Sequence, residues 1–157
     1  RLGSILYDFY GSKSGSYGDF PVENGVYLKS RVMQVKEIPA GSSISYGPLF
    51  TTVRDTRIAV VPIGFSDGLR RALSNVGKMM IHGQWAPIIG KICCDHTILD
   101  VTDLPEVKRG DCVTIWGKDG DLEQTPGDYA RLVGATAAET TAVLNHRIPR
   151  IVLTETK

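Results

Sequence analysis

The sequence predicts a mainly β fold: a Greek-key-like, closed or nearly closed β-barrel with a short helical pair near the C-terminus. Two observations predict it. Short runs rich in Val, Ile and Thr, separated by turn residues, fill most of the 157-residue chain, and branched side chains pack well on a pleated sheet. Two helix-capping signals follow in the last quarter. Short strands at regular spacing are typical of a barrel, and a chain of this length forms one domain.

The expected strands are short apolar runs. They cover residues 26–35, 44–46, 57–62, 78–81, 85–89, 97–101 and 112–116, with a closing strand at 147–153. Pro149 cannot donate a hydrogen bond to a neighbouring strand, which places the closing strand at an edge. Between two of the runs, His82-Gly83 predicts a two-residue hairpin, because glycine tolerates a positive φ. Residues 118–121 predict a second turn of the same kind.

Helix-capping residues mark the last quarter of the chain. Thr125 precedes Pro126 and is followed three residues later by Asp128, the pattern of a cap, a first-turn proline and a capping box. Gly134 can end this helix in a left-handed conformation. Residues 136–139, Thr-Ala-Ala-Glu, repeat the capping pattern. Two short helices are therefore expected here.

Composition argues against several classes of partner. The chain has 18 basic and 17 acidic side chains, so its formal charge of +1 provides no electrostatic footprint for nucleic acid. No apolar run approaches the roughly 20 residues of a membrane span. Cys93, Cys94 and Cys112 are odd in number and two of them are adjacent, which is a poor disulfide framework. We therefore expect a cytoplasmic protein with no nucleic-acid partner and no membrane segment.

Residue patterns alone leave the function open. Residues 64–68, Gly-Phe-Ser-Asp-Gly, lack the spacing of a nucleophile elbow. Residues 93–96, Cys-Cys-Asp-His, suggest a metal, but neighbours in a strand point to opposite faces and cannot converge on one ion, so no metal site is expected. Cys94 could act as a thiolate nucleophile, although a buried small hydrophobe is the commoner role.

Several segments resemble, in the same order, signatures of the alanine racemase family. They are Ser45–Gly47 with Thr51-Thr52 and Ile58–Gly68, then Ala86–Asp95, Val101–Pro105 and Arg147–Arg150, with Arg1–Gly3 similar to the end of that family's barrel domain. Each segment alone is weak evidence. Together they cover nearly the whole chain in register, which makes the resemblance strong.

The resemblance implies a two-domain enzyme whose N-terminal (β/α)₈ barrel holds pyridoxal 5'-phosphate on a lysine, with residues 1–157 as the C-terminal β-domain. The chain lacks an initiator methionine and begins in an apolar stretch, so we expect it to be part of a longer polypeptide. Residues 1–20 would be the tail of the barrel domain or the link from it. Family dimers pack head to tail, so this domain would complete the partner subunit's site. The chain alone is expected to be inactive, because the cofactor lysine is absent.

Tyr46 matches the residue that works as acid or base on one face of the substrate α-carbon, opposite the cofactor lysine. Racemisation removes a proton from one face and delivers one to the other, so two groups must flank the carbon. A phenol is a weak base at neutral pH and needs cationic neighbours. Without the resemblance, a tyrosine between serine and glycine could equally be a rim side chain whose hydroxyl faces water.

The expected cofactor-binding residues are Arg1 and His146. Arg1 matches the arginine that faces the cofactor's ring nitrogen, where a guanidinium keeps that nitrogen unprotonated. His146 stands where the family commonly has a tyrosine that contacts the cofactor phosphate, and it can still donate a hydrogen bond there. Otherwise Arg1 is an arbitrary terminal residue, and His146 is a helix-end histidine that interacts with the last carbonyls.

The resemblance also assigns residues to the substrate. Cys94 and Asp95 match the pair whose main chain and carboxylate line the substrate-carboxylate end of the site. Arg71 and Lys91 match cationic positions of the corridor that steers the carboxylate; otherwise they are solvated surface charges. Phe65 replaces a tyrosine that usually shapes the mouth of the site, a change that could admit a side chain larger than methyl.

Together these assignments predict pyridoxal-phosphate-dependent interconversion of L- and D-alanine, which the family uses to supply D-alanine for peptidoglycan. A serine or broader-specificity racemase is the alternative favoured by Phe65 and His146. A different class also stays open: a non-catalytic β-barrel module that binds a partner and does no chemistry.

Overall fold

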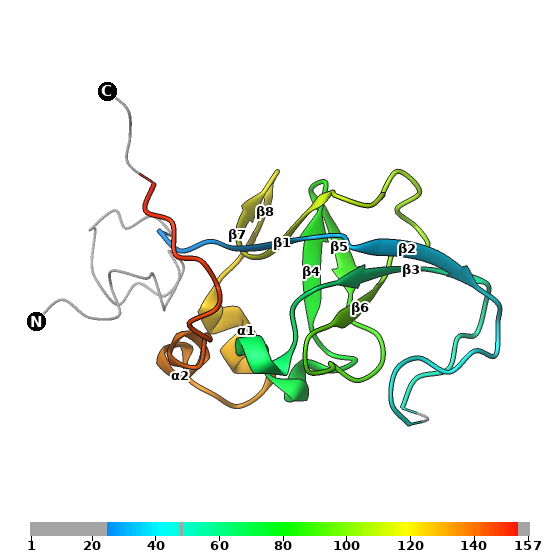
Figure 1. Ribbon diagram of the computed structural model, residues 1–157, viewed down its shortest axis with the longest axis horizontal. Helices are drawn as coiled ribbons and strands as arrows, with labels where there is room; N and C mark the ends of the chain where they lie inside the picture. Colours follow the sequence, from blue (N-terminus) through cyan, green and yellow to red (C-terminus); the bar gives the residue numbers. More distant parts are fainter. Residues whose placement is uncertain (1–24, 48, 154–157) are drawn as a thin grey trace, which may run out of the picture.

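The described chain forms two antiparallel sheets and two short helices (Figure 1). The structure is a computed structural model that describes residues 25–47 and 49–153. A five-stranded sheet has the order β1-β7-β4-β5 with β8 paired to β7, and a three-stranded sheet has the order β2-β3-β6. The elements are β1 Leu28–Arg31, β2 Gln34–Ile38, β3 Thr56–Val61, β4 Lys78–Ile81, β5 Gln84–Pro87, β6 Thr97–Asp100, β7 Cys112–Asp119, β8 Leu122–Gln124, α1 Pro126–Leu132 and α2 Ala137–Ala142.

One extended stretch joins the two sheets. Its first part, β1, pairs with β7, and its second part, β2, pairs with β3. Between them the amide of Val32 donates to the carbonyl of Asp111, and the amide of Met33 donates to the carbonyl of Val60. The run predicted as one strand at 26–35 is therefore two strands, because its hydrogen-bond partners change at this point.

The predicted hairpin at His82-Gly83 is confirmed. β4 and β5 are antiparallel, and both turn residues have a positive φ, 52° at His82 and 71° at Gly83. The amide of Gly83 also donates to the side chain of Asp119 at 3.0 Å, which ties this hairpin to the end of β7. The second predicted turn is confirmed as well, since β7 ends at Asp119 and β8 begins at Leu122.

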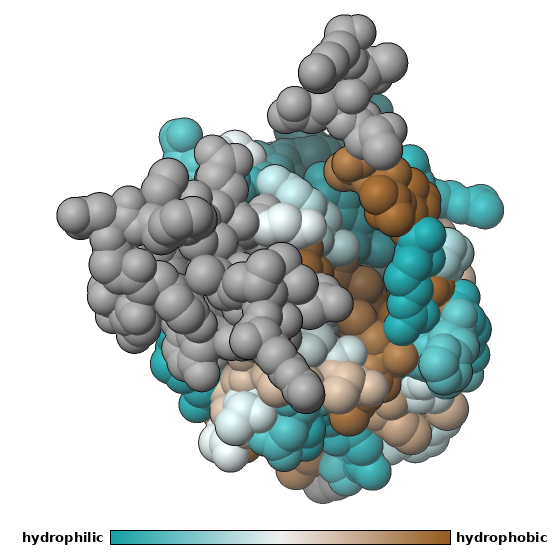
Figure 2. Space-filling model, turned by 90° about the vertical axis from the view of Figure 1, so that its left-hand side faces the viewer, coloured by the Kyte–Doolittle hydropathy of each residue, from teal (hydrophilic) through white to brown (hydrophobic). Residues whose placement is uncertain are grey.

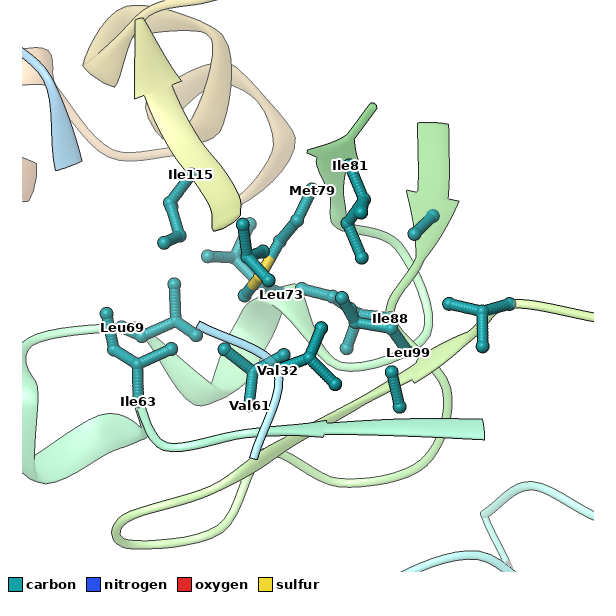
Figure 3. Packing of buried hydrophobic residues seen from close by; sticks show 14 of the residues in the cluster. Val32, Val61, Ile63, Leu69, Leu73, Met79, Ile81, Ile88, Leu99 and Ile115 are labelled. Atoms are coloured by element: carbon teal, nitrogen blue, oxygen red, sulfur yellow. The ribbon is translucent and has the colours of Figure 1, made fainter. Parts of the chain in front are cut away.

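The core lies between the two sheets and the turns that follow β3 (Figure 3). Fully buried side chains from both sheets meet there, among them Val61, Met79, Ile81, Leu99 and Ile115. At one end of the core, Trp116 packs edge-to-face on Tyr129, with the ring centroids 6.5 Å apart. Burial of this apolar surface is the main source of the stability of the fold.

Both predicted helices begin at the expected caps. The side chain of Thr125 accepts from the amide of Asp128, and that of Thr136 accepts from the amide of Glu139. The hydroxyl of the buried Tyr129 donates to the carbonyl of Lys78 at 2.7 Å, which fixes α1 to the five-stranded sheet. Neither helix of the described part of the chain is long and apolar enough to cross a membrane.

The mainly β fold with two short helices is confirmed, but some details differ from the prediction. The described strands form two open sheets, and no closed barrel is found among them. Residues 44–46 are a loop rather than a strand. Residues 147–153 form no strand either, because the side chain of Arg150 donates to main-chain carbonyls at 144, 145 and 148 and folds the segment back on itself.

Candidate functional site

Tyr46 stands at the tip of the loop that connects β2 to β3. A bridge between Ser43 and Thr51 closes this loop, and its tip turns through Ser45, a non-glycine residue with a φ of 62°. The left-handed region is costly for side chains other than glycine, so contacts must hold Ser45 there. Tyr46 itself is 74% exposed. The loop therefore presents the phenol outward.

Ser45 is anchored to the segment that follows β5. Its hydroxyl donates to the carbonyl oxygen of Lys91 at 2.7 Å and lies 3.2 Å from the Sγ atom of Cys93. The Nζ atom of Lys91 lies 3.6 Å from the position that a Cβ on Gly47 would take. A cation is therefore next to the residue that follows Tyr46.

A second segment, the turn after β3, rests on the same stretch. The amide of Phe65 donates to the carbonyl of Cys93 and the amide of Ser66 to the carbonyl of Cys94, both at 3.0 Å. Gly64 permits this approach, because a Cβ there would lie 2.3 Å from both carbonyl oxygens. Cys94 is thus held through its carbonyl, while its own amide makes no hydrogen bond with another described residue.

Gly64→Ala is expected to destabilise the protein by about 3 kcal/mol, because main-chain atoms on both sides of this contact must move apart. Gly134→Ala is the control: nothing lies within 4 Å of its added Cβ, and only its φ of +64° is unfavourable, at about 1 kcal/mol. Denaturant unfolding measures both free energies. A Gly64 variant as stable as the Gly134 variant contradicts the close contact.

Arg147 clamps the C-terminal segment onto the turn after β3. Its Nε atom donates to Asp67 Oδ1 at 2.6 Å. Its Nη2 atom donates to Ser66 Oγ at 2.8 Å and to Asp95 Oδ1 at 2.6 Å. The Ser66 hydroxyl is also within hydrogen-bond distance of the carbonyl oxygen of Cys94, at 2.7 Å, and of Asp95 Oδ1, at 2.9 Å. Arg147, Ser66, Asp67 and Asp95 are called the Arg147 cluster below.

Charge pairing in the Arg147 cluster keeps its exposed carboxylate ionised. The hydrogen bond from Arg147, and after it the contact with Ser66, holds the pKa of Asp95 below the usual range of an aspartate. Hydrogen bonds to Asp67 and Asp95 raise the pKa of the Arg147 guanidinium. Asp67 is the buried member, with its side chain 8% exposed, and it also accepts from the amide of Gly64 at 2.9 Å. Asp95 and Arg147 are therefore both charged at neutral pH.

The free energy of unfolding is expected to fall as the pH drops below about 4. The pKa of Asp95 is lower in the folded protein than in the unfolded chain. Its carboxylate thus stabilises the fold above the ordinary aspartate pKa, and this contribution is lost as the pH falls through the folded value. In denaturant unfolding, the advantage of the native protein over Asp95→Asn should be largest at neutral pH and shrink in acid. An advantage that grows in acid contradicts the pairing.

The predicted substrate-binding residues at the mouth of the site lie close together. Phe65 is 43% exposed, and the Cζ atom of Arg71 lies 5.6 Å from the centre of its ring, within cation–π range. Cys94 and Asp95 lie on the segment against which the Phe65 turn rests. Lys91 belongs to the same segment and supports the Tyr46 loop through its carbonyl.

His146 reaches this region from the C-terminal segment. It is exposed, and its neighbour Asn145 donates through Nδ2 to the carbonyl of Ser66 at 2.9 Å. Its other neighbour is Arg147, which binds the same turn through its side chain. Arg1, predicted to face the cofactor ring nitrogen, lies outside the described residues. The segments that carry Phe65, Cys94 and His146 therefore meet at the turn after β3, although they lie far apart in the sequence.

The described structure does not gather the side chains of residues 93–96 around one point. Among the described residues, no group of three or more His, Cys, Asp or Glu side chains could hold a metal ion. The Cys93 thiol faces Ser45, whereas Cys94 is exposed. The expectation of a buried Cys94 is wrong, because this residue lies in a turn held by main-chain contacts rather than in a strand that faces the core.

Ser66, Asp67 and Arg147 were not predicted as members of the site. All three stand inside the signature segments, but their roles depend on contacts between residues 80 and 81 positions apart in the sequence. One signal in the sequence could have indicated the pair of Asp67 and Arg147: a carboxylate that is buried in a turn needs a cationic partner.

The chain is similar to the C-terminal part of known proteins. The family described as alanine racemase, C-terminal domain, matches residues 26–152. The chain is 37% identical over 151 residues to alanine racemase 1 of Clostridium acetobutylicum, which covers 96% of this chain and 39% of that protein. The crystal structure of alanine racemase from Bacillus anthracis with bound L-Ala-P matches with a TM-score of 0.90 and 29% identity, over 100% of this chain and 40% of that one.

A further match is the structure of alanine racemase from Bartonella henselae with covalently bound pyridoxal phosphate. Its TM-score is 0.79 and its identity 32%, over 85% of this chain and 36% of that one. The chain spans about two fifths of the length of the curated relatives it matches. The similarity thus concerns one domain of longer proteins.

Proposed function

The chain belongs to the alanine racemase C-terminal domain family, and from this premise we propose that it completes the active site of an alanine racemase. The observation that carries the proposal is the outward position of Tyr46 on a loop anchored to Lys91 and Cys93. An ordinary rim tyrosine needs no such anchor. Racemisation requires an acid–base group on each face of the α-carbon, and Tyr46 is the group that this chain provides.

In this proposal Tyr46 removes or returns the proton on one face of the α-carbon. The Lys91 ammonium beside the loop tip stabilises negative charge that develops on the hydroxyl oxygen. Lys91 and Arg71 attract the substrate carboxylate. The amide of Cys94, which has no acceptor among the described residues, is available to donate a hydrogen bond to that carboxylate.

Pyridoxal phosphate fits the donors that the described residues offer. A phosphate needs hydrogen-bond donors, and His146 is an exposed imidazole between Asn145 and Arg147, both of which are fixed by the turn after β3. We assign His146 to the phosphate and Arg1 to the ring nitrogen, with the attaching lysine in an N-terminal domain. When bound, the cofactor withdraws electrons from the bond to the α-hydrogen.

The proposed enzyme also needs an N-terminal domain and a second subunit. Figure 2 shows hydrophobic surface on the side of the molecule that carries α2 and the C-terminal segment, and Ile151, Val152 and Leu153 are 79%, 84% and 81% exposed. Contiguous apolar surface usually marks a contact with another protein surface. We propose a head-to-tail homodimer in which Tyr46 of each subunit acts at the cofactor of the partner subunit. We also propose a cytoplasmic location, because the free cysteines stay reduced there.

Racemisation by the full-length protein tests this proposal. Together with an N-terminal cofactor domain, the protein should convert L-alanine to D-alanine, whereas residues 1–157 alone should not, because the cofactor lysine is missing. Cofactor absorbance shows whether the protein is loaded. Turnover by residues 1–157 alone contradicts the proposal. A loaded protein that racemises no amino acid contradicts it too, and favours the partner-binding module.

Racemisation of serine, or of a broader set of amino acids, is the second candidate. Phe65 favours it, because this residue brings no hydroxyl to the mouth of the site and instead stacks with Arg71. His146, shorter than the tyrosine it replaces, favours it as well. Relative kcat/KM values for alanine, serine and lysine separate the candidates. A higher value for serine than for alanine replaces the first proposal with the second.

A further inference from the structure

Arg147 joins the two segments to which the substrate and cofactor contacts are assigned. We propose that it is a positioning residue: by fixing Asp95 and Ser66, it sets the direction of the Cys94 amide that receives the substrate carboxylate. This inference rests on the proposed function and deepens it, because it names a residue that determines how the substrate is held.

The contacts form a continuous path from the guanidinium to Cys94. Nη2 of Arg147 donates to Asp95 Oδ1 at 2.6 Å and to Ser66 Oγ at 2.8 Å. Ser66 Oγ lies 2.7 Å from the carbonyl oxygen of Cys94, and the Ser66 amide donates to the same oxygen at 3.0 Å. Cys94 is therefore held by its own carbonyl and by the side chain of the next residue. The Cys94 amide shares a peptide plane with the carbonyl of Cys93, which accepts from the amide of Phe65 at 3.0 Å. The Phe65-Ser66 turn therefore fixes the direction of this amide, which has no acceptor among the described residues.

The other side of the guanidinium is anchored in the interior. Nε of Arg147 donates to Asp67 Oδ1 at 2.6 Å, and this carboxylate is 8% exposed. Asp67 Oδ2 accepts from the amide of Gly64 at 2.9 Å, and the Asp67 carbonyl accepts from the amide of Asn145 at 3.1 Å. The arrangement requires arginine, because Nε and Nη2 lie in one plane and address two carboxylates at once, whereas a lysine ammonium is a compact point charge.

In this proposal Asp95 holds the guanidinium of Arg147 and does not contact the substrate directly. Its Oδ1 atom already accepts from Arg147 and lies within hydrogen-bond distance of Ser66. Because the guanidinium balances its charge, this carboxylate repels an incoming substrate carboxylate less strongly. Without the guanidinium, Asp67 and Asp95 would both lose their cation beside the place where an anion must bind.

Arg147→Lys in the cofactor-loaded, full-length enzyme tests the inference. We expect the KM for L-alanine to rise about tenfold while kcat changes less than about threefold, since a misplaced Cys94 amide weakens substrate binding and leaves proton transfer at Tyr46 in place. Arg131→Lys is the matched control. That arginine pairs with Asp128 on α1 and is 68% exposed, so its replacement should change neither constant.

A second readout does not depend on activity. In Arg147→Lys, hydrogen–deuterium exchange should be about tenfold faster at the amides of Phe65 and Ser66, which donate to the carbonyl oxygens of Cys93 and Cys94. Ser66→Ala keeps the guanidinium and removes one link to Cys94. It should raise the KM in the same direction by a smaller factor, and it provides the test if Arg147→Lys does not fold.

An unchanged KM in a folded Arg147→Lys enzyme overturns the inference, and so does a fall in kcat alone. If that variant does not fold, an unchanged KM in Ser66→Ala overturns it. Failure of the proposed function has a different signature: the native enzyme, loaded with cofactor, would not racemise alanine at all.

Discussion

Tyr46→Phe in the full-length enzyme is expected to slow racemisation by about 10³-fold, because we propose that the phenol hydroxyl is the acid–base group on one face of the α-carbon. The loss should be asymmetric. Exchange of the α-hydrogen of L-alanine with solvent should disappear, while exchange from D-alanine, which uses the group on the other face, should persist. Mass spectrometry of alanine incubated with the enzyme in deuterated water measures both.

Tyr27→Phe is the matched control for this experiment. Tyr27 is also exposed, at 44%, but its ring packs on Gly117 and beneath the ammonium group of Lys29, at the start of β1. Loss of its hydroxyl should leave both exchange reactions unchanged. Unchanged exchange with both isomers in Tyr46→Phe would remove Tyr46 from the mechanism.

Trp116→Ala is expected to have the largest effect on stability, a loss of about 4 kcal/mol. Trp116 is 1% exposed and packs on the ring of Tyr129, so truncation opens a cavity between β7 and α1. Partial collapse of α1 into that cavity would strain the hydrogen bond from Tyr129 to the Lys78 carbonyl. Denaturant unfolding of the native protein and the variant measures the difference.

Trp116→Phe separates the volume of the indole from its hydrogen bonding. The Nε1 atom of Trp116 is buried and has no hydrogen-bond partner among the described residues. Phenylalanine therefore keeps much of the apolar contact and loses no hydrogen bond, so the expected cost is below about 2 kcal/mol. A loss as large as that of the alanine variant would contradict this account of the core.

Features that depend on neighbours in the sequence were the predictable part of the fold. The caps at Thr125 and Thr136 need only a side chain that reaches the third residue of the helix. The hairpin at His82-Gly83 needs only two residues that accept a positive φ. Each of these signals is complete within a few residues, so no distant contact is required to interpret it.

Features that depend on distant partners could not be predicted in this way. The run at 26–35 has the composition of one strand, but its hydrogen-bond partners change after Val32, and the strand of the second sheet begins at Gln34. Ile44 looks like a strand residue because it is branched and apolar. Its side chain is instead buried in a small cluster with Ile58 and Ile89. An apolar residue at this position therefore indicates a packed loop rather than a strand.

The candidate site was predicted through family resemblance rather than through pattern. Sequence spacing does not distinguish Tyr46, Phe65 and Cys94 from residues that only pack in the core. The contact between Phe65 and the Cys94 segment is seen only in the folded structure, where the turn after β3 packs on that segment. Arg147 was predicted only as part of a closing motif. Its pairing with Asp67 spans 80 positions of sequence, so nothing local specifies it.

Mixed dimers test most directly the central claim that Tyr46 of one subunit works in the site of the other. The Tyr46→Phe enzyme and an enzyme without the cofactor lysine should each be nearly inactive alone. After subunit exchange, about half of the dimers are mixed and each of these contains one complete site, so about a quarter of the native activity should return. No recovery, in a sample where mass spectrometry detects the mixed dimers, would contradict the claim.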